Sequence, residues 1–141
     1  MRQIDYETKL KGWLDFRSTI ETSINPFKDV FNYYTSKMRC KLSTDPWNRA
    51  IWPSPWELLY KDRYCNLMLT LGSCYTLQLT DRFKDYKFEI HISIDRLNEE
   101  LFYPLHVDDK ILCYSYGVVA QKSKLPTNLV PQRIYKMPRI Q

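Results

Sequence analysis

Two adjacent stretches decide the fold of this chain, and they read Trp52-Pro53-Ser54-Pro55-Trp56-Glu57-Leu58-Leu59 and Tyr64-Cys65-Asn66-Leu67-Met68-Leu69-Thr70-Leu71-Gly72-Ser73-Cys74-Tyr75-Thr76-Leu77. In the first, Ser54 is a suitable N-cap, Pro55 suits the first helical position, and Glu57 can complete a capping box, so a helix begins here. The second stretch is apolar on nearly all sides, which is typical of a buried helix. With about 16 residues and internal Thr, Ser and Asn, it is too short to cross a membrane.

Working outward, hydrophobic periodicity predicts four helices, at residues 4–23, 26–37, 55–61 and 63–80. Strict alternation predicts a half-buried strand at 86–95, followed by two more strands at 101–107 and 111–119. Pro104 donates no ladder hydrogen bond, so it marks the second of these as an edge strand or a bulge. We therefore expect a single α+β domain over residues 1–120, in which the N-terminal helices and the buried helix pack on a small three-stranded antiparallel sheet.

Residues 121–141 are expected to form an extended C-terminal arm. Its prolines at 126, 131 and 138 argue against long regular structure. Apolar residues recur along it, and an extended segment with such anchors is a docking device. The candidate apolar anchors are Leu125, Leu129, Val130, Ile134 and Tyr135.

Composition favours a packed body with adhesive surfaces, because 15% of the 141 residues are aromatic, including 11 Tyr and 4 Trp. Only 3 Gly are present, which excludes glycine-rich phosphate loops. The net charge is +5, and no acidic residue follows Asp109. The basic arm is expected either to dock on a neighbouring subunit, the favoured hypothesis, or to contact nucleic acid. Its candidate basic contacts are Arg133, Lys136 and Arg139.

Metal and cofactor chemistry is not expected. The chain has four Cys without a C-x-x-C pair and two His, so a zinc site is disfavoured. Asp108 and Asp109 are expected to be turn residues, and Glu89, His91 and Ser93 a surface-facing trio, with metal binding the weaker hypothesis for both groups. The polar start lacks a signal peptide, so synthesis in the cytoplasm with reduced thiols is expected.

Cys65 is the one residue with a catalytic character, since the start of a helix lowers a thiol pKa. The stretch Ser54–Cys65 resembles the segment leading to the cysteine in transglutaminase-like domains, which share a papain-like core, and the resemblance spans about residues 52–118. It implies a Cys–His–acid set, with His106 as the candidate base. The family places Gly before and an acid after its cysteine, whereas this chain has Tyr64 and Asn66.

The third predicted strand offers Tyr114, Ser115 and Tyr116 where that family has its acid. A cysteine without a base and an orienting group is a poor nucleophile. The favoured hypothesis is a degenerate enzyme core in which Cys65 is a small buried residue. A transglutaminase-like cysteine enzyme using Cys65 and His106 stays the alternative.

A second resemblance involves Asp45-Pro46-Trp47-Asn48, the Trp52–Leu58 stretch and Thr76-Leu77-Gln78-Leu79-Thr80, followed by the alternating strand and the region from Tyr103 to Tyr116. Together these segments are similar to small uncharacterised virion proteins of contractile-tailed marine phages, over about residues 25–120. The resemblance implies a tail, neck or baseplate component of a phage particle. It also implies other virion subunits as partners, a symmetric oligomer, and location in the virion after synthesis in the host cytoplasm.

Trp47, Trp52 and Trp56 are the remaining candidate interaction residues. They could stack nucleobases, but base-stacking platforms carry interleaved basic residues and only Arg49 lies among them in sequence, so packing in a core or a protein interface is favoured. The sequence thus predicts a structural or assembly protein acting through protein contacts, without enzymatic activity and without a membrane partner. Nucleic-acid binding through the basic arm is the second alternative.

Overall fold

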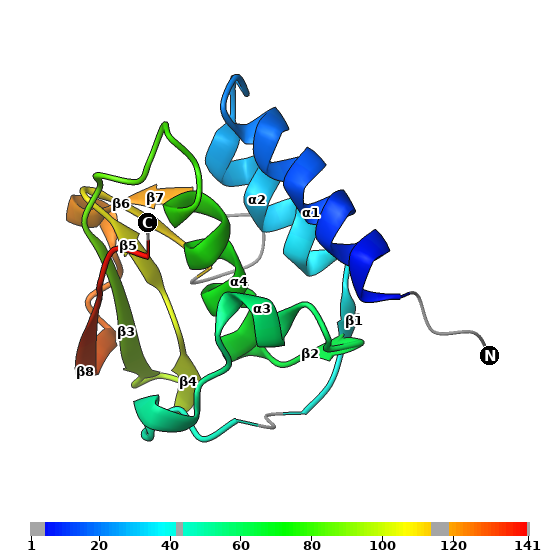
Figure 1. Cartoon of the computed structure of the whole chain (residues 1–141). Helices are drawn as coiled ribbons and strands as arrows, with labels where there is room; N and C mark the ends of the chain where they lie inside the picture. The colour runs from blue at the N-terminus through cyan, green and yellow to red at the C-terminus, as the bar shows by residue number, and fades with distance from the viewer. Residues whose placement is uncertain (1–4, 42–43, 114–118, 141) are drawn as a thin grey trace.

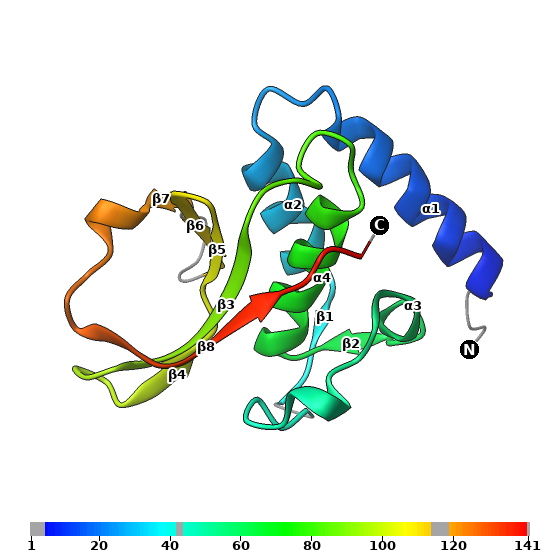
Figure 2. The same cartoon turned by 60° about the vertical axis from the view of Figure 1, so that its left-hand side comes forward.

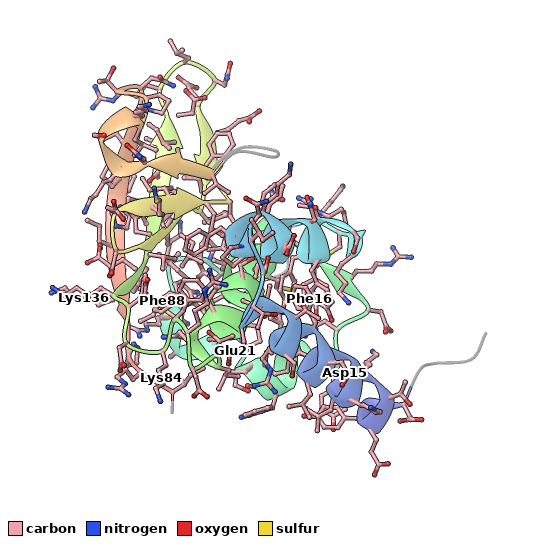
Figure 3. The ribbon with its side chains drawn as sticks, turned by 90° about the horizontal axis from the view of Figure 1, so that it is seen from above. Asp15, Phe16, Glu21, Lys84, Phe88 and Lys136 are labelled. Carbon is pink, nitrogen blue, oxygen red and sulfur yellow. The ribbon has the colours of Figure 1, made fainter. Side chains whose placement is uncertain are left out.

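A computed structural model describes residues 5–41, 44–113 and 119–140 of the chain. One buried helix, α4, lies between an antiparallel sheet on one side and helices α1 and α2 on the other (Figure 1). Seen from above, Asp15 and Phe16 of α1 lie on the opposite side of the molecule from Phe88 and Lys136 of the sheet (Figure 3). The expected mixture of helices and an antiparallel sheet is confirmed.

The described residues form four α-helices at the predicted places, each shorter than expected: α1 Tyr6–Ile20, α2 Pro26–Thr35, α3 Pro55–Leu58 and α4 Asn66–Gln78. The predicted capping box is present, since Glu57 N donates to Ser54 Oγ at 3.2 Å and Ser54 N to Glu57 Oε1 at 3.0 Å. α4 begins three residues later than predicted. The residues before it form strand β2, Arg63–Tyr64, which pairs in parallel with β1, Met38–Arg39.

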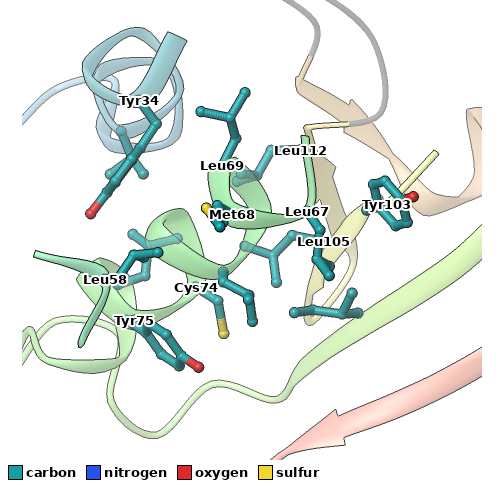
Figure 4. Packing of buried hydrophobic residues seen from close by; sticks show 14 of the residues in the cluster. Tyr34, Leu58, Leu67, Met68, Leu69, Cys74, Tyr75, Tyr103, Leu105 and Leu112 are labelled. Carbon is teal, nitrogen blue, oxygen red and sulfur yellow. The ribbon is translucent and has the colours of Figure 1, made fainter. Parts of the chain in front are cut away.

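α4 is the centre of the core, because every residue from Leu67 to Gln78 is buried. Figure 4 shows its apolar side chains between those of α2, α3 and the sheet. One hydroxyl joins three helices: Thr76 Oγ1 accepts from Trp13 Nε1 at 2.9 Å and lies 2.9 Å from the Tyr34 hydroxyl. Gly72 leaves room for the ring of Tyr34, because a Cβ there would lie only 2.3 Å from its nearest atom.

The expectation of three strands was wrong, since the described residues form six strands in the main sheet: β3 Phe88–Asp95, β4 Glu100–Phe102, β5 Leu105–Val107, β6 Lys110–Leu112, β7 Val119–Gln121 and β8 Leu129–Met137. The predicted second strand is interrupted at Tyr103 and Pro104 and becomes β4 and β5, both antiparallel to β3. The predicted third strand begins as β6, but its residues 114–118 lie outside the described residues.

The most important correction concerns the predicted C-terminal arm. Its residues Leu129–Met137 form β8, which pairs antiparallel with β3 from end to end. The register shifts between Ile92 and Ser93, which face Arg133 and Pro131 respectively, so one residue of β8 is bulged. Proline is compatible with a strand at an edge or a bulge, and β8 has both properties. The arm is therefore largely part of the sheet.

Candidate functional site

Cys65 lies at the start of α4, as predicted, but it is fully buried within the hydrophobic core. Its candidate base lies elsewhere. Leu105 and Val107 of β5 point into that core, and alternation along the strand directs His106 to the opposite face of the sheet. The structure therefore does not bring Cys65 and His106 together. The positions expected to carry an acid, Tyr114, Ser115 and Tyr116, lie outside the described residues.

His106 instead stacks on His91, with ring centroids 3.5 Å apart and an interplanar angle of 14°. His91 Nε2 lies 2.9 Å from Glu89 Oε1, and neither ring nitrogen of His106 has a hydrogen-bond partner among the described residues. Burial lowers the pKa of both imidazoles, to about 4 for His106. At neutral pH the two rings are therefore uncharged, and their stacking carries no charge repulsion.

The expectation that Glu89, His91 and Ser93 form a surface trio was wrong for the last two, which are buried. The segment between β7 and β8, which contains the 3-10 helix η2 at Lys122–Lys124, lies on the side of the sheet away from α4 (Figure 2). It is held there by Asn128, whose side chain donates to Asp95 at 2.8 Å. Within the described part of the chain, no group of three or more His, Cys, Asp or Glu side chains is placed to hold a metal ion.

The predicted interaction residues converge at a different place, on the turn at residues 45–52. Asp45 Oδ1 accepts from the backbone N–H of Trp47 at 2.9 Å, and Asn48 Oδ1 caps the 3-10 helix η1, Arg49–Ile51. The indole N–H of Trp52 then donates to the carbonyl of Asp45 at 3.2 Å. These bonds close the turn and leave Trp47 and Ile51 on the surface, 42% and 55% exposed.

β8 fixes this turn against the sheet. The Tyr135 hydroxyl donates to the Trp47 carbonyl at 3.3 Å, and its ring meets that of Trp52 edge-on with centroids 4.8 Å apart. Arg133 Nη1 donates to the Tyr135 hydroxyl at 3.1 Å. The guanidinium carbon of Arg133 lies 6.0 Å from the Trp47 ring centroid, at the outer limit of a cation–π contact.

We call Trp47, Arg49, Ile51, Arg133 and Tyr135 the aromatic–arginine surface. Arg49 adds a second cation, 5.9 Å from the centroid of the Tyr135 ring. The surface exposes apolar area beside two guanidinium groups, with the Asp45 carboxylate at its margin. Its backbone is fixed by hydrogen bonds before any partner arrives, which reduces the entropy that binding must remove.

The other predicted interaction residues do not join this surface. Trp56 contacts the ring of Trp13 on α1, with centroids 5.8 Å apart. Arg139 pairs with Asp85 at 3.0 Å. Lys136 and Ile134 are exposed on the opposite face of β8. The remaining predicted anchors are at least partly buried in the fold, namely Leu125, Leu129 and Val130.

Arg49 and Ile51 were not predicted as interaction residues. Their position in the sequence could have indicated them, because both lie in the same loop between α2 and α3 as Trp47. Their significance depends on Arg133 and Tyr135, which are more than eighty residues later in the chain and are brought near by the β3–β8 pairing. Periodicity within one segment carries no information about that pairing.

Comparison of the chain with protein-family models gives no match, and comparison with curated proteins gives none either. Among the helices described by the structure, none is long and apolar enough to span a bilayer.

Proposed function

We propose that the protein is a structural or assembly subunit of a phage particle, a component of the tail, neck or baseplate that acts through protein contacts. The observation that carries the contact function is the aromatic–arginine surface, where the exposed Trp47 and Arg49 of the turn lie beside Arg133 of β8, the strand that holds the turn. Trp, Tyr and Arg are the residues that most often dominate protein interfaces. The assignment to a phage particle is supported by the sequence resemblance to virion proteins.

The positions of the two candidate catalytic residues favour this function over the enzyme alternative. Cys65 has no exposed surface, and His106 lies on the other face of the sheet. A cysteine nucleophile needs a base within hydrogen-bond reach of its thiol. We accordingly propose that the chain has no catalytic role, needs no cofactor, and takes other virion subunits as its partners.

The test is incorporation into particles by variants that retain the fold. Trp47→Ala and Arg133→Ala remove an exposed aromatic ring and an exposed cation from the aromatic–arginine surface. Loss of one such anchor weakens an interface by about 2 kcal/mol, roughly 30-fold in affinity, so incorporation is expected to fall sharply. Trp56→Ala is the matched control, because Trp56 is 48% exposed and lies against α1. Normal incorporation of both surface variants would contradict the proposal.

Nucleic-acid binding is the second candidate, and one observation favours it. Arg133 adds a second basic residue to Arg49 and lies near the Trp47 ring, which makes the surface resemble a base-stacking platform. This alternative predicts binding of a single-stranded oligonucleotide that weakens steeply with salt and is reduced in Arg133→Ala. Our proposal predicts that Arg133→Ala leaves any retardation of the oligonucleotide unchanged.

A further inference from the structure

A hollow of about 320 Å³ lies between three segments. The first of them, α1, is on the other side of α4 from the sheet (Figure 1). One wall is the first half of α1, where Lys9, Gly12 and Trp13 share a face because they are three and four residues apart. The others are the turn after α2, which carries Lys37, and the turn after α3, which carries Lys61. We call this hollow the lysine groove.

The floor of the lysine groove is aromatic and offers no free polar group. Trp13, Tyr34 and Tyr64 form it, and all three are buried. The indole N–H of Trp13 donates to Thr76, the Tyr34 hydroxyl lies against the same side chain, and the Tyr64 hydroxyl donates to the carbonyl of Leu58. Above this floor the space is open, since a Cβ on Gly12 would meet nothing within 4 Å.

The rim carries an excess of positive charge. Lys9 Nζ lies 3.1 Å from Asp62 Oδ1. Lys37 Nζ lies 4.4 Å above the ring of Tyr33, and across the described residues neither Lys37 nor Lys61 has a carboxylate within ion-pair distance. Glu57, one turn before Lys61, is engaged in its capping box.

Lys37 is the most informative member of this rim. Burial lowers the pKa of its ammonium group, and the nearby charge of Lys9 lowers it further. The ammonium groups of Lys37 and Lys9 repel each other and are poorly solvated beside the aromatic floor. A bound anion would offset both the repulsion and the lost solvation. Lysine binds phosphate as a point charge, and a multivalent oxyanion neutralises several ammonium groups at once.

We propose that the lysine groove binds the phosphate group of a small phosphorylated molecule, held by Lys9, Lys37 and Lys61, with an apolar or planar part of the ligand on the aromatic floor. The hollow is at the lower end of the size range of small-molecule sites. This site is separate from the aromatic–arginine surface, so the two proposals stand or fall independently.

The experiment measures binding of inorganic pyrophosphate and of a nucleoside diphosphate by calorimetry at constant ionic strength. Both ligands are expected to bind, and the nucleoside diphosphate more tightly, because only it can cover the aromatic floor. Lys37→Gln and Lys61→Gln are each expected to weaken binding by about tenfold, the effect of one lost charge-assisted hydrogen bond. Lys11→Gln is the matched control, since Lys11 is on the same helix as Lys9 but is 78% exposed and pairs with Asp15.

Four results would overturn the proposal. The first is no heat of binding for either ligand at millimolar concentration. The second is an equal loss of affinity in Lys37→Gln, Lys61→Gln and Lys11→Gln, which would indicate attraction to net charge alone. The third is pyrophosphate binding as tightly as the nucleoside diphosphate, which would refute the role of the floor. The fourth is full competition by chloride at matched ionic strength.

Discussion

Replacing Thr76 with valine tests how the helical layer is held together. The side chain is fully buried on α4, and its hydroxyl oxygen contacts Trp13 of α1 and Tyr34 of α2, both at 2.9 Å. Valine has nearly the same shape, so the substitution leaves packing intact while removing the shared oxygen. Two buried polar groups then lose their partner, at about 1–3 kcal/mol each, although the Tyr34 hydroxyl can rotate. We expect Thr76→Val to lower the free energy of unfolding by about 3 kcal/mol.

The assay is urea denaturation followed by tryptophan fluorescence and by circular dichroism, whose transitions must coincide for a two-state analysis. For a chain of this size, about 3 kcal/mol corresponds to a fall in Tm of roughly 6–12 °C. Thr19→Val is the control, because Thr19 is exposed on α1 and its hydroxyl only donates to its own helix, to Phe16 O. We expect a change below about 0.5 kcal/mol there. An equally small change for Thr76→Val would refute the role of the shared hydroxyl.

Three further predictions follow from the core, the histidine pair and the thiols. Gly72→Ala should destabilise by about 1–3 kcal/mol, because its Cβ would lie 2.3 Å from a buried tyrosine ring, whereas Gly12→Ala should be neutral or stabilising in the same thermal melt. Burial holds the pKa of His106 at about 4, below its unfolded value of roughly 6.5, so the unfolded chain binds more protons and stability falls as the pH drops from about 6.5 towards 4. In His106→Leu, the urea midpoint of unfolding should fall less between pH 7 and pH 5 than in the unsubstituted protein, with measurements at pH 7, 6 and 5. An equal fall in both proteins would contradict this role of His106. With iodoacetamide, half-buried Cys40 should label before Cys65, which should react only on unfolding; rapid labelling of Cys65 would revive the enzyme alternative.

Local chemistry made much of the helical layer predictable from the sequence. The capping box at Ser54 and Glu57 forms as expected because its partners are three residues apart. The stretch that is apolar on nearly all sides forms the buried helix α4, because a helix with no polar face must pack against other elements on every side. The alternation from Phe88 to Asp95 likewise placed Ile90 and Ile92 in the core.

The missed features all depend on pairing between distant segments. Pro131 argued against a strand, but the edge position and the bulge of β8 accommodate it. His91 and Ser93 have the polarity of exposed residues, yet both are buried, on the face of β3 opposite to that of Ile90 and Ile92. The β7–β8 segment lies on that side of the sheet (Figure 2). The contact between Arg133 and Trp47 depends on the same pairing of β8 with β3, which no local pattern encodes.

Photo-crosslinking tests the central claim, that the protein acts by contact through the aromatic–arginine surface, most directly. A photoreactive residue in place of Ile51, which is 55% exposed, reports on that surface, and one in place of Leu97, which is 78% exposed, is the control. In assembled particles from the native source, we predict crosslinks to another protein subunit from position 51 and none from position 97. Absence of crosslinks from position 51, or equal crosslinks from both positions, would contradict the account.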